Sequence, residues 1–162
     1  MTASEYKWYE YFLDQIPLTA AKSKDPSTKV GAIITGPDYG DRVRGFNGFA
    51  RGVNENPEEV PERWERPEKY EWIVHAEDNA ILYAARHGIA LNGCYLFVDW
   101  HPCHTCADSI VQAGIAKVII DGDSEGYNNQ VLQERWKIKK ERAEIKLKDG
   151  GVEVIVFKRK KE

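Results

Sequence analysis

The hydrophobic positions of the chain change from helical to extended spacing and back several times. Apolar residues three and four positions apart predict amphipathic helices over residues 5–22, 75–87, 103–112 and 131–148. Pro17 lies inside the first of these segments and is expected to kink or divide it, because proline lacks the backbone N–H that a helix needs.

Short apolar runs bounded by turn residues predict strands over residues 30–35, 42–46, 94–98, 116–121 and 152–157. The resulting order, α-β-β-α-β-α-β-α-β, predicts an α/β fold of three layers, α-β-α, around a central five-stranded mixed sheet. We expect a single domain over residues 1–162. Residues 49–72 are rich in proline, glutamate and arginine and too long for a simple connection, which indicates a functional loop or lid.

The composition argues against several classes of protein. The chain is 42% hydrophobic but contains no apolar run long enough to span a membrane, so we expect a soluble protein with no membrane partner. Its net charge of −3 argues against a protein that grips long nucleic acid through the phosphates. Three cysteines, two of them in a metal-binding pattern, indicate a reducing compartment, and the expected location is cytoplasmic.

Two short motifs carry the candidate chemistry: His-Ala-Glu at 75–77 and Pro-Cys-His-Thr-Cys at 102–106. The imidazole of His75 and the thiolates of Cys103 and Cys106 make a zinc site with one position left for water, which is the catalytic pattern. Zinc lowers the pKa of such a water to about 7, and Glu77 is placed to carry its proton to a ring nitrogen and a leaving amine. His-x-Glu followed by Pro-Cys-x-x-Cys is the signature of zinc nucleobase deaminases.

A structural zinc site and a redox Cys-x-x-Cys pair are the alternatives to a catalytic site. A structural site needs a fourth protein ligand, for which Cys94, His101 and His104 are the candidates. Both motifs occur once and in the right order, with Pro102 before the first cysteine and a strand-like run between them. This arrangement favours the catalytic interpretation.

Several residues outside the motifs are candidate substrate ligands. Asn47 ends a predicted strand, where it either caps a turn or holds a ligand hydroxyl. Arg51 and Arg66 lie among acidic neighbours, and each is either a surface ion pair or a phosphate ligand. We expect at least one basic residue of the segment 49–72 to meet a phosphate. Tyr127 either stacks on a base or caps the helix that follows it.

The sequence resembles the cytidine and deoxycytidylate deaminase superfamily, and within it the deoxycytidylate (dCMP) deaminases. The resemblance runs from about residue 8 to residue 121. Besides the zinc motifs, it is carried by Ser-Lys-Asp-Pro-Ser-Thr-Lys-Val-Gly-Ala at 23–32, Gly-Phe-Asn-Gly at 45–48, His-Ala-Glu-Asp-Asn-Ala-Ile at 75–81 and Gln-Ala-Gly-Ile at 112–115.

This resemblance implies a cytidine-deaminase-like fold and the hydrolytic deamination of dCMP to dUMP and ammonia, which supplies dUMP for thymidylate synthesis. It implies that the Ala76 backbone contacts the pyrimidine, that Asn47 holds the deoxyribose and that Glu77 shuttles protons. Trp100, just before the cysteine motif, is similar to an aromatic residue that packs on the base in polynucleotide cytidine deaminases.

The resemblance also bears on cofactor and partners. Family members with an additional structural zinc have extra Cys and His before the active-site helix; residues 49–74 contain neither, so we expect one catalytic Zn²⁺ per chain. Such enzymes are generally homo-oligomers, and many respond to the effectors dCTP and dTTP.

Other functions stay open at this point. A deaminase of cytidine, CMP or single-stranded nucleic acid would share the zinc motifs, as would a tRNA adenosine deaminase. A non-catalytic nucleotide-binding protein on the same fold is a further alternative. Retention of Glu77 argues against it, because the fold alone does not require this carboxylate.

Overall fold

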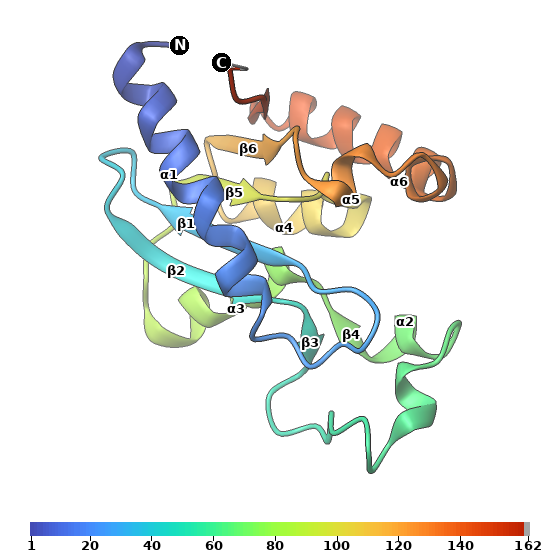
Figure 1. Cartoon of the computed structure of the whole chain (residues 1–162). Coiled ribbons are helices and arrows are strands. Elements are labelled where there is room, and N and C mark those ends of the chain that lie inside the picture. The colour runs from blue at the N-terminus through green and yellow to red at the C-terminus, as the bar shows by residue number, and fades with distance from the viewer. Residues whose placement is uncertain (161–162) are drawn as a thin grey trace.

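Five strands form one mixed sheet, as predicted (Figure 1). In the computed structural model, which describes residues 1–160 without the side chains of residues 132 and 133, the strands lie in the order β2-β1-β5-β6-β7. Strand β1 runs antiparallel to β2 and β5, whereas β5, β6 and β7 are parallel. The strands are β1 (Gly31–Thr35), β2 (Asp41–Phe46), β5 (Tyr95–Val98), β6 (Lys117–Asp121) and β7 (Glu153–Phe157).

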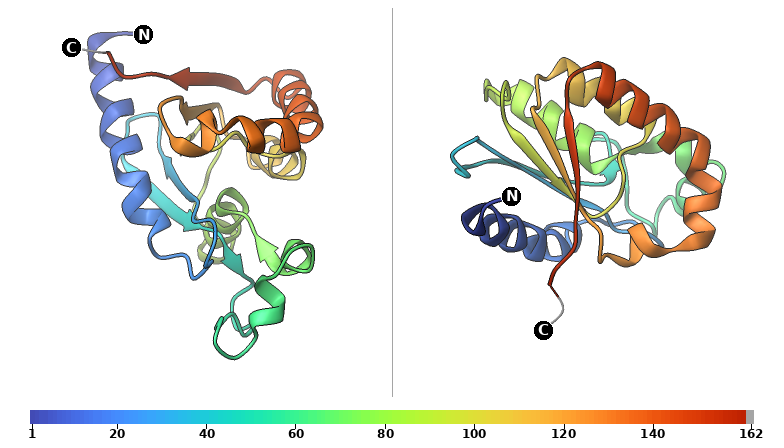
Figure 2. Two further views of the ribbon diagram at one scale, coloured as in Figure 1. Left: turned by 45° about the vertical axis from the view of Figure 1, so that its right-hand side comes forward. Right: turned by 90° about the horizontal axis from the view of Figure 1, so that it is seen from above.

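Helices cover both faces of this sheet, which confirms the three-layer prediction (Figure 2). Helix α1 (Ala3–Ala20) covers one face, and α3 (Ala76–His87), α4 (His104–Gln112) and α6 (Gln130–Asp149) lie on the other. Each face of the sheet has its own hydrophobic core, and alternate side chains of β1 point into one or the other. Ile33 packs in the core beneath α1, and Ala32 and Ile34 pack in the core beneath α3 and α4.

Pro17 was expected to kink or divide the first helix, and the prediction of a division is wrong. Helix α1 is continuous from Ala3 to Ala20. Pro17 removes one hydrogen bond, to the carbonyl of Leu13, but only three helical residues follow it. At the other end, Thr2 and Glu5 form a reciprocal capping box, in which Glu5 N donates to Thr2 Oγ1 over 3.1 Å. Burial of one face against the sheet supplies the rest of the helix's stability.

The segment that the sequence marked as a functional loop has short elements of its own. It contains the 3₁₀ helix η1 (Pro61–Trp64) and α2 (Lys69–Trp72). At its two ends, β3 (Gly48–Phe49) pairs with β4 (Ile73–Val74). Trp64 stacks on Phe49 with ring centres 4.3 Å apart. The segment projects from one end of the sheet and leads directly into α3 (Figure 1).

Helix α3 touches strand β2 at a glycine. A Cβ atom on Gly45 would overlap the carbonyl oxygen of Ala76 and lie 2.6 Å from the backbone nitrogen of Ala80. Only glycine therefore allows this close approach, which fixes the N-terminal end of α3 against the sheet.

The last described residues tie the C-terminal end of the chain to α1 and β6. Arg159 forms ion pairs with Asp14, Asp121 and Asp123, and Lys160 N donates to Tyr6 Oη over 2.8 Å. None of the helices within residues 1–160 has both the length and the hydrophobicity that crossing a bilayer requires.

Candidate active site

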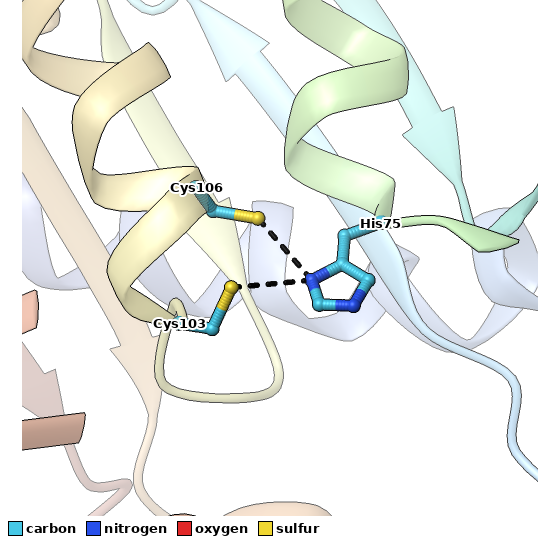
Figure 3. A group of neighbouring side chains, drawn as sticks. All are labelled: His75, Cys103 and Cys106. Atoms are coloured by element: carbon cyan, nitrogen blue, oxygen red, sulfur yellow. Dashed lines mark hydrogen bonds between the residues drawn. The ribbon is translucent and has the colours of Figure 1, made fainter. Parts of the chain in front are cut away.

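The two metal-binding motifs lie at the N-terminal ends of neighbouring helices. His75 is the N-cap of α3, Cys103 is the N-cap of α4, and Cys106 lies in the first turn of α4. Figure 3 shows the imidazole facing both sulfur atoms. His75 Nδ1 lies 3.4 Å from Cys103 Sγ and 3.3 Å from Cys106 Sγ. Side chains far apart in the sequence thus converge on one point.

This donor set fits a zinc ion. The nitrogen and the two sulfur atoms all lie within 4.8 Å of one another. Tetrahedral zinc with ordinary bond lengths places nitrogen and sulfur ligands about 3.6 Å apart, close to the separations found here. Within residues 1–160, Cys94, His101 and His104 are not members of this group. Three protein ligands leave one position for water or substrate, as in catalytic zinc sites.

The protonation states of the three ligands depend on one another. A hydrogen bond from Cys106 lowers the pKa of Cys103 to about 2 and raises the pKa of Cys106. The hydrogen bond with Cys103 also raises the pKa of His75 to about 9, although burial opposes this shift. Zinc binds thiolate and neutral imidazole, so a bound ion would displace the protons that the group holds.

Glu77 lies buried beside the ligands. The residue is 4% exposed, and its Oε2 atom lies 3.8 Å from Cys106 Sγ. Burial raises the pKa of Glu77 to about 7, although the nearby charge of His75 opposes the shift. A carboxyl that titrates near neutral pH can both accept and release a proton. Asp78, which sequence analysis did not single out, lies 3.7 Å from the same sulfur.

The ligand group opens onto a pocket whose wall contains most of the predicted site residues. Those on the wall are Asn47, Arg66, His75, Ala76, Glu77, Trp100, Cys103 and Tyr127. Cys106 is buried behind the wall. Arg51 lies outside it, with its guanidinium carbon 6.0 Å from the centre of the Tyr83 ring. Of the two arginines that the sequence offered as phosphate ligands, Arg66 therefore lies on the pocket wall and Arg51 does not.

The side chain of Asn47 holds the loop between α1 and β1 through three hydrogen bonds. Its Nδ2 donates to Thr28 O over 2.8 Å and to Asp25 Oδ2 over 3.2 Å, and its Oδ1 accepts from Val30 N over 2.8 Å. The amide oxygen has a second lone pair, and it is the atom of this side chain left for a ligand hydroxyl. Asn47 therefore shapes the pocket wall whether or not it also binds a ligand.

The short helix α5 (Glu125–Asn128), which carries Tyr127, packs against Trp100 just after the end of β5. Ser124, the N-cap of α5, donates through Oγ to Asp99 O and accepts from Tyr127 N. A Cβ atom on Gly126 would overlap the Trp100 indole, so glycine allows the helix to lie directly on this ring. Both aromatic residues line the pocket.

Sequence analysis missed the contribution of α6 to the pocket. Arg135, Trp136, Lys139 and Lys140 of this helix all lie on the wall, as does Tyr70 of α2. The charged face of α6 was visible in the sequence, but helical spacing does not reveal which other element that face meets. Two further wall residues, Asp25 and Lys69, form a buried ion pair.

Comparison with known proteins agrees with this site. Residues 6–121 match the family model described as "Cytidine and deoxycytidylate deaminase zinc-binding region". The chain is 38% identical over 148 residues to an uncharacterized deaminase of Aliivibrio fischeri from the luxG 3′ region, covering 91% of this chain and 92% of that protein. It is 36% identical over 123 residues to human deoxycytidylate deaminase, covering 72% of this chain and 66% of the human one. The chain thus matches about two thirds of the length of that relative.

A solved structure shares the fold along nearly the whole chain. The crystal structure of dCMP deaminase from the cyanophage S-TIM5, in complex with dCMP and dUMP, superposes with a TM-score of 0.70. The two sequences are 25% identical, and the match covers 97% of this chain and 99% of the phage protein. The expected resemblance from about residue 8 to residue 121 is therefore confirmed, and this chain belongs to the cytidine and deoxycytidylate deaminase family.

Proposed function

We propose that this protein is a zinc-dependent hydrolase that converts dCMP into dUMP and ammonia, a step that supplies dUMP for thymidylate synthesis. The observation that carries the proposal is the convergence of His75, Cys103 and Glu77 on one pocket wall, with Cys106 directly behind them. The named activities of the human relative and of the S-TIM5 enzyme support dCMP as the substrate.

The chain's own residues account for the proton transfers of this reaction. His75, Cys103 and Cys106 would hold one zinc ion per chain. When bound, zinc supplies a nucleophile at neutral pH by lowering the pKa of water. Glu77, whose pKa of about 7 lets it act as base and as acid, takes the proton onto a carboxylate oxygen. The same carboxyl then delivers this proton to the pyrimidine ring nitrogen. It carries a second proton, from the oxygen that bonds to the ring carbon, to the amino group, whose C–N bond breaks to release ammonia.

The pocket wall supplies groups to orient the base and sugar. We assign the backbone of Ala76 to the pyrimidine and the second lone pair of Asn47 Oδ1 to the deoxyribose hydroxyl. Trp100 and Tyr127 provide flat surfaces against which a base can pack.

Three further properties stay predictions for this chain. We expect a homo-oligomer, a response to dCTP or dTTP, and a reducing cytoplasmic setting that keeps the two ligand thiols from oxidation. Light scattering of the purified protein measures the first, and the rate of ammonia release with and without each effector measures the second.

The alternative is a deaminase of another cytosine compound, such as cytidine, CMP or a single-stranded nucleic acid. These alternatives share the zinc chemistry and differ in the sugar, phosphate or polynucleotide that the rest of the pocket binds. A non-catalytic nucleotide-binding protein is less well supported, because Glu77 is buried beside the metal ligands without an evident structural role.

One measurement tests the proposal. Purified protein with one zinc ion per chain is assayed for ammonia release from dCMP, CMP, deoxycytidine and a single-stranded oligodeoxynucleotide. A preference for dCMP of at least tenfold in kcat/KM is the expected result. Preference for a nucleoside or the oligonucleotide overturns the substrate assignment, and no ammonia from any of them overturns the assignment as a cytosine deaminase.

A further inference from the structure

Two arginines from different parts of the chain meet at one tyrosine hydroxyl on the rim of the pocket. Arg66 donates through Nε to Tyr70 Oη over 3.0 Å, and Arg135 of α6 donates through Nη2 to the same oxygen over 2.5 Å. All three residues line the pocket that also contains His75 and Glu77. Arg135 lies beyond the part of the chain that matches the family model, which ends at residue 121.

This pair of cations lacks a compensating negative charge. Within residues 1–160, neither guanidinium forms an ion pair with a carboxylate. Arg66 contacts Thr28 Oγ1 over 3.4 Å, and Arg135 lies 5.6 Å from the centre of the Tyr70 ring. Two guanidinium groups on one neutral oxygen repel each other, and a bound anion would turn this repulsion into attraction.

The arrangement around Tyr70 presents only hydrogen-bond donors. The Tyr70 oxygen accepts from both arginines, which leaves its own O–H free of any acceptor recorded within residues 1–160. Its ring packs edge-on against Trp136, with centres 6.1 Å apart, so the phenol is held in place. Two guanidinium forks and one O–H are donors suited to the oxygens of a phosphate group.

We propose that Arg66, Tyr70 and Arg135 form the binding site for the 5′-phosphate of a nucleoside monophosphate. This proposal rests on the proposed function, because it takes the same pocket to hold the cytosine near His75. A phosphate monoester carries a charge of about −2 near neutral pH, which matches the two guanidinium groups. The site selects the monophosphate over the free nucleoside, and Tyr70 keeps both arginines positioned before substrate arrives.

The kinetic test uses Arg135→Gln and Arg66→Gln, with Arg142→Gln as the matched control. Arg142 is exposed on the same helix but does not line the pocket. We expect each of the first two variants to lower kcat/KM for dCMP by about 10- to 100-fold, the range for loss of a hydrogen bond to a charged group. For deoxycytidine, kcat/KM should stay within twofold, and the control should match the parent protein on both substrates.

Tyr70→Phe tests the role of the hydroxyl separately, since it keeps the ring against Trp136. We expect a smaller loss for dCMP, about 3- to 10-fold, again with deoxycytidine unaffected. Equal losses for dCMP and deoxycytidine in all three variants, or no loss for dCMP in either arginine variant, would overturn the proposal.

Binding measurements keep this inference distinct from the proposed function. Calorimetric titration with dUMP and with deoxyuridine needs no turnover. We expect dUMP to bind at least tenfold more tightly than deoxyuridine to the parent protein, and this ratio to collapse in Arg135→Gln. If dUMP binds in this way but dCMP is not deaminated, the proposed function fails and the phosphate site stands. If dCMP is deaminated but the ratio is unchanged in Arg135→Gln, the phosphate site fails alone.

Discussion

Lys69 Nζ lies 2.5 Å from Asp25 Oδ2, and the two side chains are 4% and 0% exposed. Asp25 also accepts hydrogen bonds from Ser27 N and Asn47 Nδ2, over 2.9 and 3.2 Å. This ion pair joins α2 to the loop before β1 and forms part of the pocket wall. It therefore links the position of Arg66 and Tyr70 to that of Asn47.

Replacement of Lys69 by methionine should destabilise the protein strongly. The change leaves the buried Asp25 carboxylate without its cation, which costs about 3–5 kcal/mol in the free energy of unfolding. Lys24→Met is the matched control, because the Lys24 side chain is 59% exposed in its ion pair with Glu55. An exposed pair contributes at most about 1 kcal/mol. Urea unfolding of both variants measures the difference; similar losses would contradict the role assigned to the Asp25 pair.

The contribution of Asp25 to the free energy of unfolding should depend on pH. Burial raises the pKa of Asp25, but hydrogen bonds from Lys69, Ser27 and Thr28 outweigh it, and the net pKa is lowered. A carboxyl with a lowered folded-state pKa stabilises the fold fully above its unfolded value of about 3.9 and loses this contribution as pH falls through the folded-state pKa.

The measurement compares the free energies of unfolding of the parent protein and Asp25→Asn from pH 7 down to pH 3. We expect a gap between the two that is constant down to about pH 4 and shrinks below it. A gap that grows on acidification would mean that the folded-state pKa is raised instead.

Glu77→Gln should abolish turnover without disturbing the metal centre. The amide has the size of the carboxylate but cannot carry a proton, and loss of a general acid–base group lowers kcat by about 10²–10⁴-fold. Zinc content by mass spectrometry and the melting temperature should stay near those of the parent protein. Glu71→Gln, on the exposed surface of α2, is the control and should retain full activity. Activity within tenfold of the parent in Glu77→Gln would refute the proton shuttle.

The zinc content of two variants, Cys106→Ala and Cys94→Ala, should distinguish a metal ligand from a cysteine of the core. Cys106 lies 3.3 Å from the His75 imidazole, whereas Cys94 packs in the core with its sulfur 3.8 Å from Ala90 O. We expect zinc content to fall from one ion per chain to near zero in the first variant and to stay at one in the second. Retained zinc in Cys106→Ala would exclude this thiol as a ligand.

Gly45→Ala should disturb the active site through the backbone. The added methyl group would strike Ala76 O and the Ala80 backbone, neither of which can rotate away, so we expect a loss of about 1–3 kcal/mol. Zinc affinity should fall as well, because His75 begins the helix that is displaced. The control is Gly40→Ala, whose nearest neighbours are side-chain atoms of Arg42 and Asp38. Unchanged zinc affinity in Gly45→Ala would contradict this role.

The strands and the metal ligands could be predicted because their signals are local. The three central strands β1, β5 and β6 are buried on both faces and give short apolar runs. The motifs place ligands at the starts of two helices. The sequence also indicated that Cys94 belongs to the core; its side chain is buried, although it lies just before β5 and not within it. In all these cases the evidence lies within a few residues of the feature itself.

The pocket rim could not be predicted, because it depends on contacts between distant segments. Arg135 meets Tyr70 across 65 positions of sequence, and its place on a charged helix looks the same as that of Arg142. Arg51 and Arg66 lie in the same kind of acidic loop, and only the packing of that loop separates them. Pro17 was misjudged because its effect depends on how near the helix end it lies.

The pocket wall combines residues from two parts of the chain: the region that matches the family model, and helix α6, which follows it. Residues 6–121, which match the family model, contain the candidate metal ligands His75, Cys103 and Cys106 and the carboxyl of Glu77. Arg135, Trp136 and Lys139 lie after this region, on α6. A change at one of these three positions would therefore alter the pocket wall while leaving the candidate metal ligands and Glu77 in place. A screen that diversifies these three positions is a direct route to deaminases with new substrates.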